Sequence, residues 1–155
     1  ATDQSATSIL DFTNAMYAAG AGGFFDAAGS HPYTYPASPA DPHPNSFNAF
    51  ANLGTIHDIM AAHGDGAKKI WVTEYGAPTG NARQAVSAAR QAQLILDGLA
   101  VAYRLQFVDK VMIYSLRDTG TNPADPEQNF GLITASGQKK PSFTALQQAL
   151  MPGAN

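Results

Sequence analysis

Three short apolar runs along the chain alternate with longer segments of helical periodicity. The runs lie at residues 24–33, 70–73 and 111–118, and each stops at polar or aromatic side chains near turn-forming residues. Apolar runs of this length, bounded by turn signals, are typical of buried strands. Because a helical segment lies between each successive pair, the order β-α-β-α-β predicts parallel strands joined by crossover helices.

The helical segments are recognised by apolar residues that recur every three or four positions. They span residues 8–19, 48–63, 83–106 and 141–150, with Ser8 as the expected N-cap of the first. The stripes expected to face the core contain Ile9, Phe12, Met16 and Ala19 in the first helix, Phe50, Leu53, Ile56 and Met60 in the second, and Val86, Ala89, Leu96, Leu99 and Tyr103 in the third. The solvent side of the third helix is expected to carry Gln84, Arg90 and Gln91.

Candidate functional groups stand where each apolar run ends. His31 and Tyr33 close the first run, Glu74 closes the second, and Arg117 and Asp118 close the third. The carboxyl ends of strands are the places where a parallel barrel displays its catalytic groups.

Glu74 is the most informative of these residues. It ends the strand pattern directly before Gly76 and Pro78, and the chain contains only one other glutamate, Glu127. Taken alone, such a carboxylate could simply mark the place where a strand meets water. The polar groups at the two neighbouring strand ends favour a functional role.

These strand ends together resemble the C-terminal half of a clan A glycoside hydrolase. The motifs that carry the resemblance are His31-Pro32-Tyr33, Trp71-Val72-Thr73-Glu74-Tyr75-Gly76-Ala77-Pro78, Tyr114-Ser115-Leu116-Arg117-Asp118-Thr119-Gly120, Asn129-Phe130-Gly131-Leu132 and Lys140-Pro141-Ser142-Phe143. The resemblance extends from about Ser8 to Leu150 and is greatest to bacterial cellulase-like and family 39-like (β/α)8 enzymes. It implies an α/β fold in which residues 1–155 form one domain, a partial TIM barrel with about strands 6–8 and helices 5–8.

The resemblance also implies roles for individual residues. Glu74 matches the nucleophile at the end of barrel strand seven, and His31 and Tyr33 match residues that line the sugar subsite. The further candidates for substrate binding are Tyr75, Tyr114, Arg117 and Asp118. Tyr75 could either orient the Glu74 carboxylate or pack beneath it.

The sequence lacks the second carboxylate that the resemblance requires. The family's acid/base is a glutamate after an asparagine, and no Asn-Glu pair occurs in this chain. Retaining hydrolysis needs two carboxyl groups roughly 5–5.5 Å apart. Glu127 lies in a proline-punctuated loop and is expected to be a solvated carboxylate, whereas Asp118 is expected to form an ion pair with Arg117 or to cap a backbone amide.

Residues 34–45 contain four prolines and therefore predict an ordered loop at the mouth of the site. The aromatic side chains Tyr35 and Phe47 beside His31 and Asn45 suit a carbohydrate subsite, because sugars stack on aromatic rings and need hydrogen-bond partners. Tyr35 and Phe47 could equally serve only to anchor the loop.

Composition limits the possible partners. The 155 residues are 45% hydrophobic and 14% charged, with a net charge of −3, which suits one domain but not a complete barrel of about 250 residues. The basic residues are scattered, so no nucleic-acid partner is expected, and no apolar segment approaches the roughly 20 residues that span a bilayer. The expected partners are an oligo- or polysaccharide and either a missing N-terminal half or further copies of the chain.

No cofactor or metal is expected, because the four histidines show no ligand spacing and no glycine-rich phosphate loop follows a strand. The absence of cysteine fixes no compartment, and we expect an extracellular or cell-envelope protein. The chain starts at Ala1 rather than methionine, which suggests a cleaved or trimmed product.

The function that follows is retaining hydrolysis of O-glycosyl bonds by a fragment or subunit that carries the nucleophile but not the acid/base. The isolated chain is expected to be inactive or very weak. The alternatives are a non-catalytic carbohydrate-binding half-barrel and a processed fragment with no activity of its own.

Overall fold

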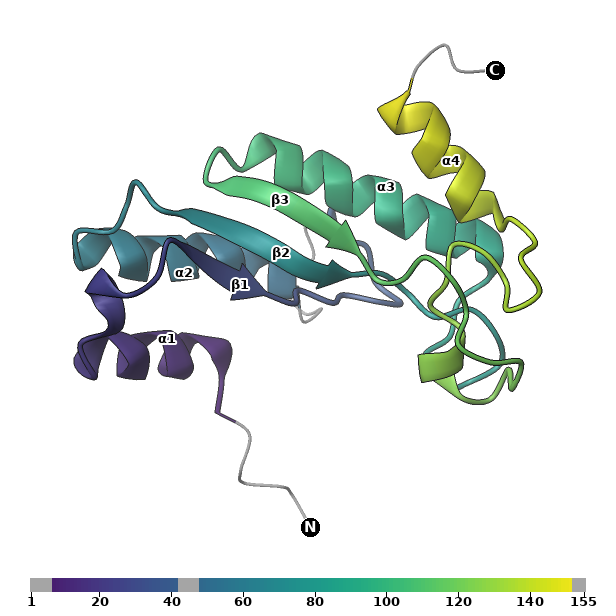
Figure 1. Ribbon diagram of the computed structural model, residues 1–155, viewed down its shortest axis with the longest axis horizontal. Helices are drawn as coiled ribbons and strands as arrows, with labels where there is room; N and C mark the ends of the chain where they lie inside the picture. The colour runs from purple at the N-terminus through teal and green to yellow at the C-terminus, as the bar shows by residue number, and fades with distance from the viewer. Residues whose placement is uncertain (1–6, 42–47, 152–155) are drawn as a thin grey trace.

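The computed structural model describes residues 7–41 and 48–151, and in these segments three strands alternate with four α-helices. In chain order the elements are α1 (Ile9–Ala18), the 3-10 turn η1 (Ala21–Gly23), β1 (Ala27–Ser30), α2 (Ala49–Ala62), β2 (Lys69–Tyr75), α3 (Ala88–Arg104), β3 (Val108–Ile113), the 3-10 turn η2 (Pro126–Gln128) and α4 (Pro141–Leu150). The strands form one parallel sheet in the order β1-β2-β3 (Figure 1), so the predicted β-α-β-α-β alternation is confirmed. Asn45 of the predicted loop and the neighbouring Phe47 lie outside the described residues.

The first three helices begin at a side chain that caps a backbone N–H, and the caps are Ser8, Asn48 and Ser87. Such caps satisfy donors that the first helical turn leaves unpaired. The cap at Ser8 is confirmed, but α3 starts at Ala88, several residues later than predicted. The preceding residues form a turn in which Val86 pairs with the segment after β2.

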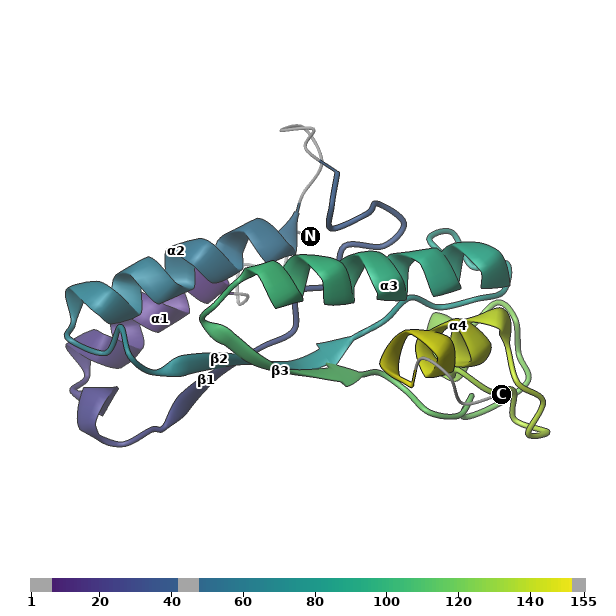
Figure 2. The ribbon, with the colours of Figure 1, turned by 90° about the horizontal axis from the view of Figure 1, so that it is seen from above.

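Helices α2 and α3 lie on one face of the sheet, with α1 beside α2 and α4 beside α3 (Figure 2). The core between α2 and the sheet contains Phe50, Leu53, Ile56 and Met60 of α2 together with Ile70, Val72 and Tyr75 of β2. The predicted stripe of α2 is therefore confirmed. Its four side chains recur at the helical spacing and meet a strand that is apolar on the same side.

The predicted stripes of α1 and α3 match the buried residues only in part: Val86 is buried, although it precedes α3, and Met16 packs against the core. In α1 the buried residues are Thr13 and Tyr17, whereas Phe12 is 57% exposed. In α3 the predicted core residue Tyr103 is 88% exposed, and Gln91, predicted to face solvent, is completely buried. The buried side of each helix depends on the elements that it packs against: α1 packs mainly against α2 and η1, and α3 packs against both β3 and α4.

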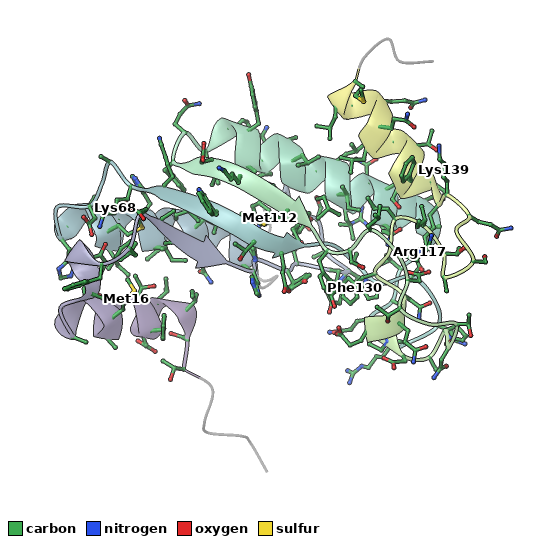
Figure 3. All side chains as sticks on the ribbon, in the orientation of Figure 1. Met16, Lys68, Met112, Arg117, Phe130 and Lys139 are labelled. Carbon is green, nitrogen blue, oxygen red and sulfur yellow. The ribbon has the colours of Figure 1, made fainter. Side chains whose placement is uncertain are left out.

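The opposite face of the sheet carries no helix among the described residues, and Figure 1 looks onto this open face. Trp71 lies on it half-buried, with the ammonium group of Lys110 4.4 Å from the centre of its ring. Met112, labelled in Figure 3, is 44% exposed on the same face. In a closed barrel this face would line the packed interior.

A local irregularity near the end of β2 determines which way Glu74 points. The register with β3 shifts between Val72 and Tyr75. Strict alternation from Ile70 and Val72 would turn Glu74 toward the helices. The shift instead buries Tyr75 on the helix side and leaves Glu74 at the open carboxyl edge.

Candidate active site

The carboxyl ends of β1 and β2 bring His31, Tyr33 and Glu74 together. The Tyr33 hydroxyl donates a hydrogen bond of 2.8 Å to Glu74 Oε2. His31 Nδ1 lies 3.4 Å from the same oxygen, and the two side chains are 52% and 36% exposed, respectively. Both contacts use Oε2, and among the described residues Oε1 has no hydrogen-bond partner. One carboxylate oxygen is therefore held by both neighbours, whereas the other is contacted by neither.

Tyr33 remains a neutral donor because its environment opposes ionisation. Burial raises the pKa of Tyr33 well above its ordinary value, and the hydrogen bond to Glu74 raises it further. A phenolate beside the Glu74 carboxylate would place two negative charges in contact. The phenol consequently keeps its proton, and hence its hydrogen bond, throughout the neutral pH range.

Tyr33 packs against a cluster of aromatic side chains. Phe130 is its centre, at 3% exposure, and its ring centre lies 5.8 Å from that of Tyr33, 5.6 Å from Tyr35 and 5.3 Å from Tyr114. All three pairs meet edge to face, an arrangement that aromatic rings prefer. The predicted residues Tyr33 and Tyr114 are thus joined through a residue that the sequence did not single out as functional.

Arg117 does not join this group. Its exposed guanidinium lies beside Gly137, in the turn before α4, and Figure 3 places it to the α4 side of Phe130. Among the described residues it forms no ion pair or hydrogen bond with Glu74. Its predicted place beside the substrate has no support in this arrangement.

Tyr75 packs beneath the site rather than facing it. Its side chain is 1% exposed, and its hydroxyl donates to Leu94 O at 2.9 Å. Burial raises the pKa of Tyr75 to about 12. The ring fills the space that a side chain at Gly98 would need. This burial agrees with the packing alternative, and a contact of Tyr75 with substrate stays a prediction.

Asp118 is also withdrawn from solvent. Its Oδ1 accepts hydrogen bonds of 2.7 Å from the Gly131 backbone N–H and from Lys140 Nζ. The backbone cap was expected, but the ionic partner is Lys140 rather than Arg117. The Asp118 side chain is only 6% exposed and its Oδ1 is engaged, so this geometry indicates a structural role, and its contact with a substrate stays a prediction.

No second carboxylate contacts Glu74 within residues 7–41 and 48–151. Glu127 is exposed in η2, as expected for a solvated carboxylate. Burial raises the pKa of Tyr35, and the negative charge of Glu127 raises it further. In the described segments no three His, Asp or Glu side chains form a metal-binding group, and no helix there is long and apolar enough to cross a membrane.

The fold and site define a segment of a parallel β/α protein with a fixed carboxylate at a strand end. No protein-family profile and no curated protein matches the chain. Among solved structures, it is similar to a family 39 glycoside hydrolase from the gut symbiont Bacteroides cellulosilyticus WH2, with 23% identity, a TM-score of 0.71, and coverage of 92% of this chain and 31% of that one. A β-glucuronidase from Ruminococcus gnavus in complex with D-glucuronic acid matches with 15% identity, a TM-score of 0.57, and coverage of 80% and 23%.

A β-glucuronidase from an uncultured Clostridium species gives 21% identity, a TM-score of 0.54, and coverage of 81% and 23%. These similarities show the fold: the chain matches part of glycoside hydrolase structures and spans less than a third of their length. The expected resemblance to glycoside hydrolases, including a family 39 enzyme, is thereby confirmed at the level of structure.

Proposed function

We propose that this chain is the nucleophile-bearing part of a retaining glycoside hydrolase with a (β/α)8 barrel, in which β1, β2 and β3 serve as about strands 6–8. The observation that carries the proposal is the Glu74 carboxylate at the end of β2, held through Oε2 by Tyr33 and His31 of the neighbouring strand end. The fold similarity to glycoside hydrolases supports it.

The reaction proposed for the complete barrel is a double displacement. A Glu74 oxygen attacks the anomeric carbon and forms an ester bond to the sugar, while the bond to the leaving-group oxygen breaks and that oxygen takes a proton from a second carboxyl group. Water then attacks the anomeric carbon, gives up a proton to that group and releases Glu74 as a carboxylate. Tyr33 and His31 fix Oε2, which leaves Oε1 free to attack.

A mechanism-based fluorosugar tests the role of Glu74 in the completed enzyme. We expect a covalent adduct that peptide mass spectrometry places on Glu74, and hydrolysis of an ordinary substrate should give a product in which the configuration at the anomeric carbon is retained. Glu74→Gln should remove the adduct, whereas Glu127→Gln, which changes the only other glutamate, should keep it. Labelling at any other residue would refute the proposal.

The chain alone should hydrolyse glycosides very weakly or not at all. General acid catalysis typically contributes roughly 10²–10⁴-fold, and no second carboxyl group lies beside Glu74 among the described residues to act as the general acid. Aryl glycosides with good leaving groups need little proton assistance, so any residual activity should appear with them and disappear in Glu74→Gln. Ordinary turnover of unactivated oligosaccharides by the chain alone would contradict this expectation.

The open face and edges of the sheet support association with further strands. A groove of about 800 Å³ runs along α3, β3 and α4, lined by apolar side chains such as Leu99, Tyr103 and Leu150, and a cavity of about 490 Å³ lies beside β1. Unpaired strand edges and exposed apolar surface favour pairing with another chain or segment. A monodisperse monomer in sedimentation, without binding of a surface-sensitive dye, would count against association.

A carbohydrate-binding half-barrel without catalysis remains the second candidate. The absence of a second carboxylate near Glu74 in the described segments favours it, as do the aromatic rings at the strand ends. In that case the chain alone would bind oligosaccharide in calorimetry, and Glu74→Gln would leave that binding intact. We further propose an extracellular or cell-envelope location, which secretion of the full-length protein by its source organism would test.

A further inference from the structure

Gln91 is a fully buried polar side chain in the first turns of α3. Its Nε2 donates to three backbone carbonyls, Ala77 O at 2.9 Å, Phe130 O at 3.3 Å and Gly131 O at 3.2 Å. Its Oε1 accepts a hydrogen bond of 2.8 Å from Ser142 Oγ, itself completely buried. The amide thus satisfies groups that an apolar side chain of the same size would leave unpaired.

The partners of Gln91 come from three separate segments of the chain. Ala77 follows β2 three residues after Glu74, Phe130 and Gly131 belong to the segment between η2 and α4, and Ser142 is in the first turn of α4. The Gln91 amide is therefore hydrogen-bonded both to the segment that follows the strand of Glu74 and to the segment that contains Phe130. Neither segment has regular secondary structure of its own at these carbonyls.

The aromatic segment in turn reaches Glu74 through two contacts. The Phe130 ring packs edge to face on Tyr33, and Tyr33 donates its hydroxyl hydrogen bond to Glu74 Oε2. On the other side, the backbone at Gly76 passes so close to Tyr114 and Phe130 that an added Cβ would lie 2.1 Å from Tyr114 O and 3.5 Å from the Phe130 ring. Movement of the segment would consequently be transmitted to both the backbone and the side-chain support of Glu74.

We propose that Gln91 is a positioning residue for Glu74: it holds the end of β2 and the Phe130 segment at a fixed separation, so that Tyr33 can bind the carboxylate. Gln91 does not touch a substrate. The consequence for catalysis rests on the proposed function. The geometric claim does not, because it concerns only the contact between Tyr33 and Glu74.

Selective ¹³C labelling of glutamate gives a direct test. The chain contains only Glu74 and Glu127, so two carboxyl resonances are expected, and Glu127 serves as an internal reference. Tyr33→Phe first establishes how far the Glu74 signal moves when its hydrogen bond is removed. Gln91→Met keeps the volume and removes the hydrogen bonds. We expect it to shift the Glu74 signal in the same direction and to weaken the nuclear Overhauser contacts between the Phe130 and Tyr33 rings.

Two further variants keep the test decisive. Gln93→Met changes an exposed glutamine of the same helix, whose amide donates to Asp97 at 2.7 Å, and should leave both glutamate signals in place. Ser142→Ala removes only the donor to Gln91 Oε1 and should give a smaller shift of the same sign, even if Gln91→Met does not fold. A role in stability alone would lower the melting temperature of Gln91→Met and Ser142→Ala with the Glu74 signal and ring contacts unchanged, which would overturn the proposal. None of these measurements uses glycoside chemistry, so failure of the proposed hydrolase function would leave them unaffected.

Discussion

The buried pair of Asp118 and Lys140 offers a stability test of its structural role. The two side chains are 6% and 8% exposed, and Lys140 Nζ also donates to Thr79 Oγ1 at 3.0 Å and to Asn129 O at 3.1 Å. Lys140→Met would leave the Asp118 carboxylate buried with only the Gly131 N–H to stabilise its charge. Removing one partner of a buried pair typically costs about 3–5 kcal/mol.

That loss would be easy to measure. With a urea dependence of about 1–3 kcal/mol per molar, the midpoint of unfolding should fall by about 1 M or more. For a chain of this size the melting temperature should fall by about 6–20 °C. Circular dichroism during urea and thermal unfolding reports both quantities. Lys139→Met is the matched control, because Lys139 is exposed and its ammonium group lies 4.6 Å from the centre of the Phe143 ring. Such contacts at exposed sites contribute only about 0.5–1 kcal/mol.

The double variant Asp118→Asn with Lys140→Met separates charge burial from packing. It removes both charges and keeps an oxygen that can accept from the Gly131 N–H, so it should recover much of the stability lost in Lys140→Met. Two results would refute the reasoning: equal losses in Lys140→Met and Lys139→Met, or a double variant no more stable than Lys140→Met alone. Either would mean that Asp118 is not held as a buried ion.

Two other perturbations have clear expected outcomes. An added Cβ at Gly98 would lie 2.2 Å from the Tyr75 ring, so Gly98→Ala should lower the free energy of unfolding measured in urea by about 1–3 kcal/mol. In the control Gly54→Ala, the added Cβ meets nothing within 4 Å in α2, so this variant should be more stable by about 0.5–1 kcal/mol. Equal effects of the two substitutions would disprove the close packing. The hydrogen bond from Lys68 lowers the pKa of Asp65 below its ordinary value of 3.8, so this carboxylate stabilises the fold above that value, and its contribution is lost as the pH falls through the lower folded value. Asp65→Asn should therefore show a flatter acid limb in unfolding measured from pH 6 to pH 2, and an unchanged limb would contradict the assignment.

The parallel order of the strands and the place of Glu74 could be predicted because both depend on local patterns. An apolar run that stops at a carboxylate, with glycine and proline next, predicts a strand end wherever the strand is paired. The α2 stripe was predictable for the same reason, since one helix face meets one strand face. His31 and Tyr33 follow a short apolar run at the neighbouring strand end, and the structure brings them to Glu74.

The side-chain directions at Tyr75 and Gln91 could not be predicted in this way. Tyr75 turns inward because β2 changes register with β3, which depends on a strand more than thirty residues further along the chain. Gln91 looks like a solvent-facing residue by type, and the carbonyls that bury it belong to segments up to 40 residues away. Local periodicity carries no information about such partners. A prediction based on periodicity therefore assigns the wrong burial to polar residues that bridge distant segments.

The strand count constrains how this sheet could be completed. Two copies of a three-stranded sheet would bring six strands and three copies nine, whereas the barrel of the proposed function has eight, and strand number, tilt and stagger are linked in a closed barrel. A complement of five further β/α units fits this geometry, and it would cover Trp71 and Met112 while pairing both β1 and β3. Because the carboxyl ends of parallel strands share one rim, strand ends of the complement would face Glu74 across the barrel mouth. The proton donor that the proposed reaction needs would then come from the complement, and the site would form only when both edges of the sheet are paired.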